Sequence, residues 1–188
     1  MTEPPPPEGA VTERARQAIT RFDDAVDTWV QQWRGNPTLD RVMYAASELG
    51  DFSLIWHLIG TARALAPDRR AEDAVRVATI IGLESVFVNG VVKSLVGRRR
   101  PAWEQDRPLN LRQPRTSSFP SGHASSAVTA FGVLAQNDPL WPLYAVVAAT
   151  VATSRVYVKV HHASDVVAGA ALGAGLALLA RRVWPARK

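Results

Sequence analysis

The chain has 188 residues, enough for one domain, with 22 Lys and Arg against 17 Asp and Glu and a net charge of +5. It has no cysteine, which excludes disulfides, thiolate zinc sites and iron–sulfur clusters. The basic residues gather at the ends of apolar segments, as at 98–100 and 181–182, and do not alternate with stacking aromatic residues along a helix face. We therefore expect no binding to nucleic acid.

The N-terminal quarter divides into a tail and two amphipathic segments. Residues 1–9 hold four consecutive prolines and no signal-peptide features, and we expect them to form a disordered tail. Within residues 10–49, apolar side chains recur every three or four positions over 12–32, and a shorter segment follows a Gly-Asn-Pro break. Both segments suit amphipathic helices at a membrane interface, with Trp29 and Trp33 at headgroup level, and both suit the core of a soluble protein equally well.

Five apolar segments, each predicted to be a helix, follow Gly50. They cover residues 52–66, 74–96, 122–136, 139–158 and 163–183. A helix that crosses a bilayer needs about 20 residues, and none of the five is an uninterrupted apolar run of that length, since the second contains Glu84 and Lys93. No strand alternation or internal repeat competes with the helical pattern.

Two details of the last segments favour a membrane. Gly169 and Gly173 are spaced to let two helices approach closely in lipid. Trp141 opens one segment and Trp184 closes the next, so antiparallel helices would bring both to the same interface. The sequence thus predicts an all-α integral-membrane bundle over residues 50–188, with about five transmembrane helices.

Three polar segments interrupt this apolar pattern. They are Lys93–Pro101, Pro120–His123 and Ser154–Asp165. In an antiparallel bundle, the first follows the second helix, the second precedes the third, and the last joins the fourth to the fifth. All three are therefore expected to meet at one face of the bundle.

The residue types in these segments suit a phosphate group. Lys93, Arg100 and Arg155 supply three cations, enough to neutralise a phosphate dianion and the charge of its transition state. Ser121 and Gly122 precede a predicted helix, so their backbone N–H groups and the helix dipole would bind an anion.

Two histidines add the chemistry of phosphoryl transfer. One of His123 and His161 can attack phosphorus while the other protonates the leaving oxygen. Asp165, four residues after His161, can accept a hydrogen bond from one ring nitrogen and leave the other free to attack. A metal site of His161, His162 and Asp165 is the alternative, but the surrounding cations disfavour a divalent ion. We expect no metal and no cofactor.

The spacings Lys-x6-Arg-Pro, Pro-Ser-Gly-His and Ser-Arg-x5-His-x3-Asp resemble the three signature motifs of the type 2 phosphatidic acid phosphatase superfamily, complete and in order. The resemblance implies a multi-pass membrane phosphatase, with its active site on the outer face, that acts on a lipid phosphate or a polyprenyl (di)phosphate. It implies His161 as the nucleophile that forms a phosphohistidine, His123 as the general acid and Asp165 as the partner of His161. The implied phosphate-binding residues are Lys93, Arg100, Ser121, Gly122 and Arg155.

Two other functions fit the same residues less well. A vanadate-dependent haloperoxidase has a similar site, but the short chain and lipid-compatible helices disfavour it. A catalytically silent membrane lipid-binding protein has no need of both histidines and every cation. We expect Arg98 and Arg99 to contact the interface or a headgroup, Asn89 to orient Lys93, and residues 102–119 to select the lipid. The roles of Glu84 and His162 stay open, as does the oligomeric state.

Overall fold

The computed structural model describes residues 8–65, 71–103, 108–112 and 116–186, with side chains described from Thr12 onward, and every regular element in these ranges is helical. Most of the predicted tail, residues 1–7, lies outside the described residues. In chain order the elements are α1 (Glu8–Gln31), α2 (Pro37–Leu49), the 3-10 turn η1 (Asp51–Ser53), α3 (Leu54–Ala64), α4 (Ala71–Ser85), the π-helical η2 (Val86–Val92), α5 (Lys93–Leu95), α6 (Gly122–Leu134), α7 (Trp141–Tyr157) and α8 (Ala163–Val183). The predicted all-α class is confirmed.

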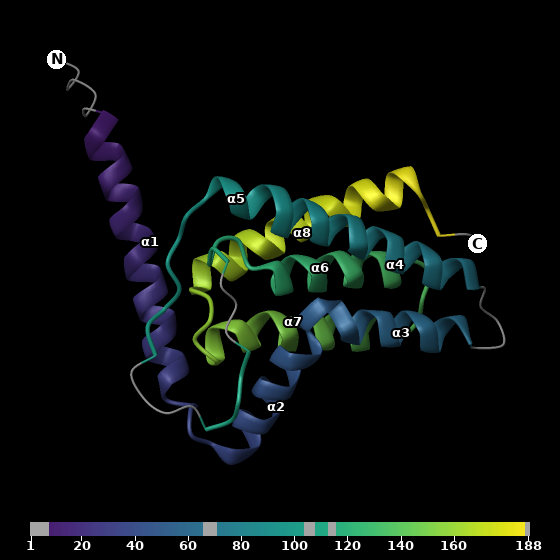
Figure 1. Ribbon diagram of the computed structural model, residues 1–188, viewed down its shortest axis with the longest axis horizontal. Coiled ribbons are helices and arrows are strands. Elements are labelled where there is room, and N and C mark those ends of the chain that lie inside the picture. The colour runs from purple at the N-terminus through teal and green to yellow at the C-terminus, as the bar shows by residue number, and fades with distance from the viewer. Residues whose placement is uncertain (1–7, 66–70, 104–107, 113–115, 187–188) are drawn as a thin grey trace.

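The five predicted apolar segments form one bundle. They correspond to α3, the continuous α4–η2–α5 rod, α6, α7 and α8, which run along the long axis of the molecule (Figure 1). α6 is the central helix, and it packs mainly against α8, α7 and α4. Its small side chains, among them Ala124, Ala127 and Ala130, are fully buried, which lets the neighbouring helices approach closely.

The closest helix contact lies between α6 and α8. A Cβ atom on Gly169 or Gly173 would lie far inside van der Waals contact with the backbone carbonyl oxygens of Ser121 and Ser125. The hydroxyl of Thr129 also donates a hydrogen bond across this contact, to the carbonyl oxygen of Gly173 (3.2 Å). The two spaced glycines therefore form a helix-packing face, as the sequence predicts.

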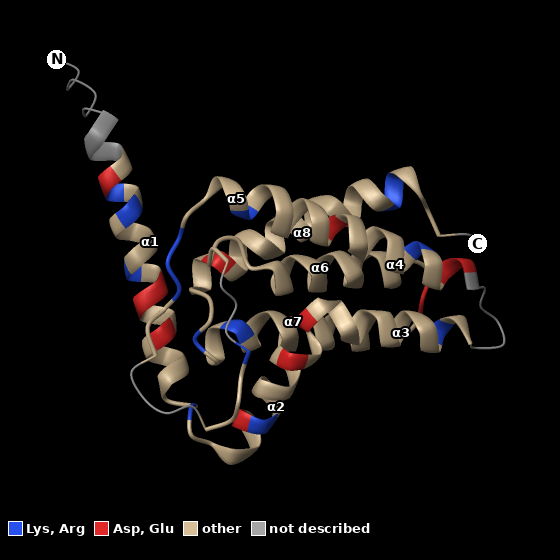
Figure 2. Ribbon diagram, viewed as in Figure 1, with Lys and Arg blue, Asp and Glu red and all other residues tan. Residues whose placement is uncertain are grey.

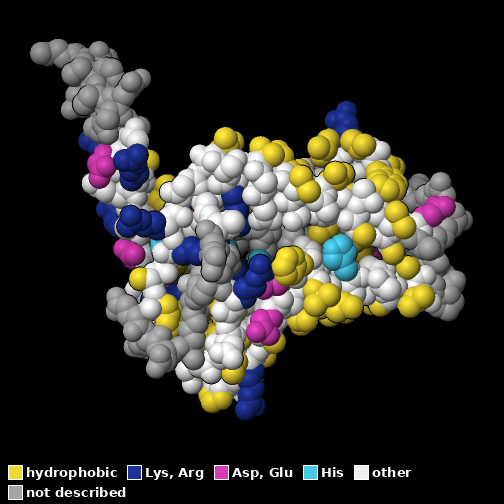
Figure 3. All heavy atoms as spheres, in the orientation of Figure 1, with side chains coloured by type: hydrophobic (Ala, Val, Ile, Leu, Met, Phe, Trp, Pro, Cys, Tyr) yellow, Lys and Arg dark blue, Asp and Glu magenta, His cyan; other side chains and the backbone are white. Residues whose placement is uncertain are grey.

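The outer surface of the bundle is apolar. Large hydrophobic side chains of α4–α5 and α8 are more than half exposed, including Leu83 (66%), Leu95 (77%) and Leu178 (67%). Figure 3 shows hydrophobic side chains spread along the bundle, and Figure 2 shows most charged residues at its two ends or in α1 and α2. A soluble protein seldom exposes so much apolar surface, whereas a bilayer requires it.

Two helices, Glu72–Leu95 and Ala163–Val183, are long and apolar enough to cross a membrane by length and composition alone. α3, α6 and α7 are shorter, with 11, 13 and 17 residues. At 1.5 Å per residue α6 extends about 20 Å, against about 30 Å of hydrocarbon in a bilayer. The number of about five transmembrane helices therefore remains a prediction.

The two amphipathic helices gather at one end of the bundle. α1 crosses this end, and its N-terminal half extends beyond the bundle (Figure 1). α2 begins with an Asn36 cap, whose side-chain oxygen accepts the N–H groups of Thr38 and Leu39, and it packs against α7. Arg34 joins the two helices to the bundle by donating to the carbonyl oxygens of Val156 and Tyr157 (2.9 and 2.8 Å).

Candidate active site

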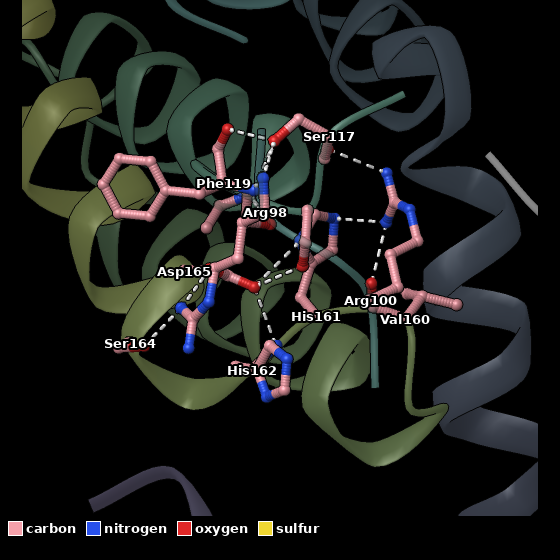
Figure 4. Close-up of polar contacts among 12 residues, drawn as sticks. Arg98, Arg100, Ser117, Phe119, Val160, His161, His162, Ser164 and Asp165 are labelled. Carbon is pink, nitrogen blue, oxygen red and sulfur yellow. Dashed lines mark hydrogen bonds and ion pairs between the residues drawn. The ribbon is translucent and has the colours of Figure 1, made fainter. Parts of the chain in front are cut away.

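The three polar segments meet at the end of the bundle that α1 and α2 cover, as predicted. Two contacts join them: Arg100 Nη1 lies 3.2 Å from His161 Nε2, and the backbone N–H of Ser121 donates to the carbonyl oxygen of Asp165 (3.0 Å). Figure 4 shows His161 between Arg100 on one side and Asp165 on the other. Segments that lie far apart in the sequence thus form one cluster.

His161 lies in the turn between α7 and α8 and is only 3% exposed. Burial, together with the positive charges of Arg155, Arg100 and Lys93, lowers the pKa of His161 to about 3, against the opposing effect of Asp165. The imidazole is therefore neutral at physiological pH. A neutral ring has one nitrogen lone pair available for attack, which a nucleophile requires.

Asp165 is fully buried, and its carboxylate accepts hydrogen bonds from three groups. Oδ1 accepts from Arg98 Nη1 (2.6 Å), and Oδ2 accepts from the Ser118 hydroxyl and from the backbone N–H of His162 (2.9 Å). Nδ1 of His161 lies 3.7 Å from Oδ2, which is longer than a hydrogen bond. The two side chains face one another without a hydrogen bond between them, so the expected pairing of Asp165 with His161 stays a prediction.

Arg98 lies in a different place from the one that its sequence context predicts. We expected it at the interface or on a headgroup, but it points inward and bridges Asp165 to Asp23 Oδ2 (2.7 Å) on α1. Asp23 is 5% exposed and also accepts the backbone N–H of Ser164 (2.7 Å), one of the free donors in the first turn of α8. The two carboxylates offset the charge of this guanidinium, so Arg98 is held partly buried against the end of the bundle.

The three predicted phosphate-binding cations surround His161. Arg100 is held in place by the carbonyl oxygens of Val160 (2.7 Å) and Ser117 (3.1 Å). Arg155 is 1% exposed and donates to the side chain of Ser47 on α2. Lys93 follows the π-helical turn η2, and such turns shift the direction of the side chains after them and are frequent at functional sites.

The phosphate-binding role predicted for the Ser121 backbone needs correction. The Ser121 N–H is already used by the carbonyl oxygen of Asp165, and the Ser121 hydroxyl caps α6 by accepting from the N–H of Ala124 (3.4 Å). Gly122 leaves space for Asn89, because a Cβ there would lie 2.8 Å from Asn89 Oδ1. Asn89, expected to orient Lys93, donates instead to Ser85 Oγ (3.2 Å).

His123 lies in the first turn of α6, and its side chain faces residues that were not among the predicted site residues. Its Nε2 lies 3.1 Å from the carbonyl oxygen of Ser47 and 3.2 Å from Asp51 Oδ1. Gly50 packs against the imidazole so closely that a Cβ would overlap the ring. All three residues belong to the end of α2 and the start of η1, where an acidic side chain on an amphipathic segment looks like an ordinary solvated charge.

A cavity of about 440 Å³ lies beside this cluster of candidate residues, between α1, α2 and the residues that follow Arg100. Its lining is aromatic and polar, with Arg34, Asp40, Tyr44, Trp103, Tyr157 and Lys159 among the residues that face it. None of the eight residues predicted for catalysis or phosphate binding lines this cavity, so we assign it no part in the chemical step.

The alternative metal site gains no support from the geometry. Among the described side chains, no group of three or more His, Asp or Glu is placed to hold a metal ion. Glu84 is buried in α4 (3% exposed) and lies beside Ser125 of α6. This position favours the helix–helix contact over a catalytic role for Glu84.

Comparisons with known proteins agree with the geometry. Residues 73–188 match the PAP2 superfamily. The decaprenylphosphoryl-5-phosphoribose phosphatase of Mycobacterium tuberculosis is 34% identical over 146 residues, which cover 76% of this chain and 78% of that protein. The crystal structure of a transmembrane PAP2 type phosphatidylglycerolphosphate phosphatase from Bacillus subtilis superposes with a TM-score of 0.67 at 26% identity, covering 88% of this chain and 86% of that one. Aquifex aeolicus LpxE superposes with a TM-score of 0.66 at 25% identity, over 84% and 93% of the two chains.

Proposed function

The chain belongs to the PAP2 superfamily, and on that premise we propose that it is a membrane phosphatase that releases phosphate from a lipid phosphate through a phosphohistidine, without a metal ion. The observation that carries the proposal is the buried imidazole of His161, whose Nε2 lies 3.2 Å from Arg100 Nη1 within a group of three cations that hold the pKa of the ring below its usual value. A silent lipid-binding protein has no use for a buried neutral histidine in that position. A haloperoxidase is disfavoured by the apolar outer surface of the bundle.

The reaction has two steps. The phosphate dianion binds among Lys93, Arg100 and Arg155, and Nε2 of His161 attacks phosphorus while the bond from phosphorus to the lipid oxygen breaks. His123 gives its proton to the leaving oxygen, so the lipid departs as an alcohol. In the second step water attacks the phosphohistidine, His123 takes a proton from that water, and phosphate leaves with His161 restored.

The names of the relatives support a substrate class for this chain. Their names describe phosphatases of a polyprenyl-linked phosphosugar and of phosphatidylglycerolphosphate, both of which carry a phosphate monoester on a membrane lipid. We extend this class, lipid and polyprenyl phosphates, to the present chain. A mobile lipid tail would lie along the apolar helices while the phosphate enters the cationic end of the bundle.

Phosphate release by the purified protein tests this function directly. We expect release from phosphatidate, phosphatidylglycerolphosphate or a polyprenyl phosphate to be unchanged by EDTA and to be inhibited by orthovanadate. Vanadate adopts the five-coordinate geometry of the phosphoryl-transfer transition state, which the three cations would stabilise. Activity that disappears in EDTA and returns with zinc or magnesium would replace the proposed mechanism with a metal-dependent one.

We also propose that the bundle crosses the membrane several times and that α1 lies in the headgroup region. Exposed apolar residues of α1 and of the turn after it support this position: Ile19 and Phe22 are each 46% exposed and Trp29 60%, and Trp33, just beyond the end of the helix, is 49% exposed. On a helix of 3.6 residues per turn Ile19, Phe22 and Trp29 form one stripe, about a quarter turn from Asp23 on the bundle-facing side. Such a stripe with aromatic residues is typical of helices that lie at a bilayer surface.

A labelling experiment tests the orientation, with the catalytic end outside. The chain has no cysteine, so a single cysteine can be introduced at exposed Asn110, near the catalytic end, or at Ala186, near the other end. On intact cells we expect an impermeant maleimide to modify Asn110→Cys and to spare Ala186→Cys until the cells are opened. The reverse pattern would show that the catalytic end faces the cytoplasm.

A further inference from the structure

The hydrogen bonds of His123 determine which of its nitrogens carries a proton. Nε2 lies within 3.2 Å of two oxygens, the carbonyl of Ser47 and Oδ1 of Asp51. A carbonyl oxygen and an ionised carboxylate can only accept hydrogen bonds. Nε2 must therefore be the donor, and in the neutral ring Nδ1 is the nitrogen with the free lone pair.

Asp51 is held in place by an unusual turn. The two residues after it, Phe52 and Ser53, both adopt left-handed backbone conformations (φ 53° and 57°), which are uncommon for residues other than glycine. Gly50, on the other side of Asp51, packs directly against the His123 ring. Such backbone conformations cost free energy. They are retained only where the surrounding structure holds them, and they are frequent at functional sites.

The charges around Asp51 keep it ionised. Partial burial alone would raise the pKa of Asp51, but the hydrogen bond from His123 and the positive charges of Arg155 and Arg112 hold that pKa below its usual value. A carboxylate therefore faces His123, with the cations Arg155 and Arg112 near it. A neighbouring carboxylate stabilises the protonated form of an imidazole, whereas neighbouring guanidinium groups oppose it.

We propose that Asp51 is the positioning residue of the general acid: it holds the Nε2 proton of His123 and stabilises the imidazolium, so that Nδ1 gives its proton to the leaving oxygen and later takes one from water. The active centre then has one carboxylate for each histidine, Asp165 for the nucleophile and Asp51 for the acid. This assignment rests on the proposed phosphatase function. Asp51 lies outside residues 73–188 that match the family, and none of the three motifs contains it.

The dependence on the leaving group tests the proposal. A lipid alkoxide needs protonation to leave, whereas p-nitrophenolate does not. We expect Asp51→Asn to lower kcat/KM for a short-chain phosphatidate at least about 10-fold, a part of the roughly 10²–10⁴-fold that general acid catalysis contributes as a whole. The pre-steady-state burst of p-nitrophenol from p-nitrophenyl phosphate should change less than about 3-fold, because this step needs no acid. Glu48→Gln, an exposed residue with the same change of charge three residues earlier, should leave both rates unchanged.

The possible outcomes separate this proposal from the function on which it rests. If the unmodified protein releases no phosphate from any lipid phosphate, the proposed function itself fails. If Asp51→Asn slows the lipid reaction and the p-nitrophenol burst equally, or lowers the melting temperature with loss of both, Asp51 supports the fold and the proposal is wrong. Recovery of lipid turnover in Asp51→Glu, with no recovery in Asp51→Ala, would confirm that a carboxylate is required at this position.

Discussion

Replacement of His161 with alanine should abolish phosphate release from every substrate, because no phosphohistidine can form without the ring. The cations Lys93, Arg100 and Arg155 would still bind phosphate, so the variant should retain affinity for orthovanadate or product phosphate. We expect no burst of p-nitrophenol from His161→Ala, even though that leaving group departs without protonation. A variant that neither forms nor hydrolyses the phosphohistidine but still binds vanadate or phosphate is expected when the nucleophile has been removed.

His123→Ala should behave differently. Its turnover of a lipid phosphate should fall roughly 10²–10⁴-fold, the usual contribution of a general acid, while the burst of p-nitrophenol persists. Hydrolysis of the intermediate should be slow, because His123 also takes the proton from the attacking water. Phosphohistidine should therefore accumulate in this variant and be detected at position 161 by mass spectrometry.

The control is His57→Ala, which removes a half-buried histidine of α3 that lies outside the three motifs, and it should retain full activity. A phosphate label at His162 or His123 would assign the nucleophile to another residue. If His161→Ala and His123→Ala lose the p-nitrophenol burst to the same extent, the two histidines do not have separate roles.

Gly169→Ala and Gly173→Ala should each weaken the contact between α6 and α8. The new methyl group would overlap a backbone carbonyl oxygen, of Ser121 or Ser125, and a backbone atom cannot rotate away as a flexible side chain can. Overpacking of this kind typically costs about 1–3 kcal/mol, and here it would also displace Ser121, whose N–H binds the carbonyl oxygen of Asp165. We therefore expect Gly169→Ala to lower both the melting temperature in detergent and the rate of phosphate release.

Gly175→Ala is the matched control on the same helix. A Cβ at Gly175 would meet no atom within 4 Å, so the substitution adds no clash. Alanine is favoured over glycine in a helix by about 1 kcal/mol, so the melting temperature should stay the same or rise. If all three glycine variants melt together with the unmodified protein, the α6–α8 approach is looser than the structure indicates.

The sequence by itself was sufficient to single out the residues that we propose for the chemistry. His161, His123, Lys93, Arg100 and Arg155 stand in three short motifs, and each was recognisable because phosphoryl transfer needs a nucleophile, an acid and several cations. The helices were recognisable too, since apolar periodicity and Gly or Pro breaks are local properties of the chain. Their antiparallel order was enough to predict that the three motifs meet at one end.

The partners of these residues were decided only by the tertiary structure. Asp23 and Arg98 are 75 positions apart, and Ser47 and Arg155 are 108 positions apart. Asp23, Ser47 and Asp51 lie on or just after amphipathic helices, where a polar side chain normally faces water, so their local sequence resembles that of solvated residues. Their position against the proposed catalytic centre depends on how α1 and α2 dock on α7 and α8.

The same reason explains the corrections at Arg98 and Ser121. A run of three arginines after an apolar helix is typical of a membrane interface, and a serine before a helix is typical of an anion-binding N-terminus. Arg98 instead finds two carboxylates, and the Ser121 N–H finds the carbonyl oxygen of Asp165, because close packing of α8 brings these acceptors within hydrogen-bond distance. The pairing of donors with acceptors depends on how the helices pack. It cannot be predicted from the spacing of residues along one segment of the chain.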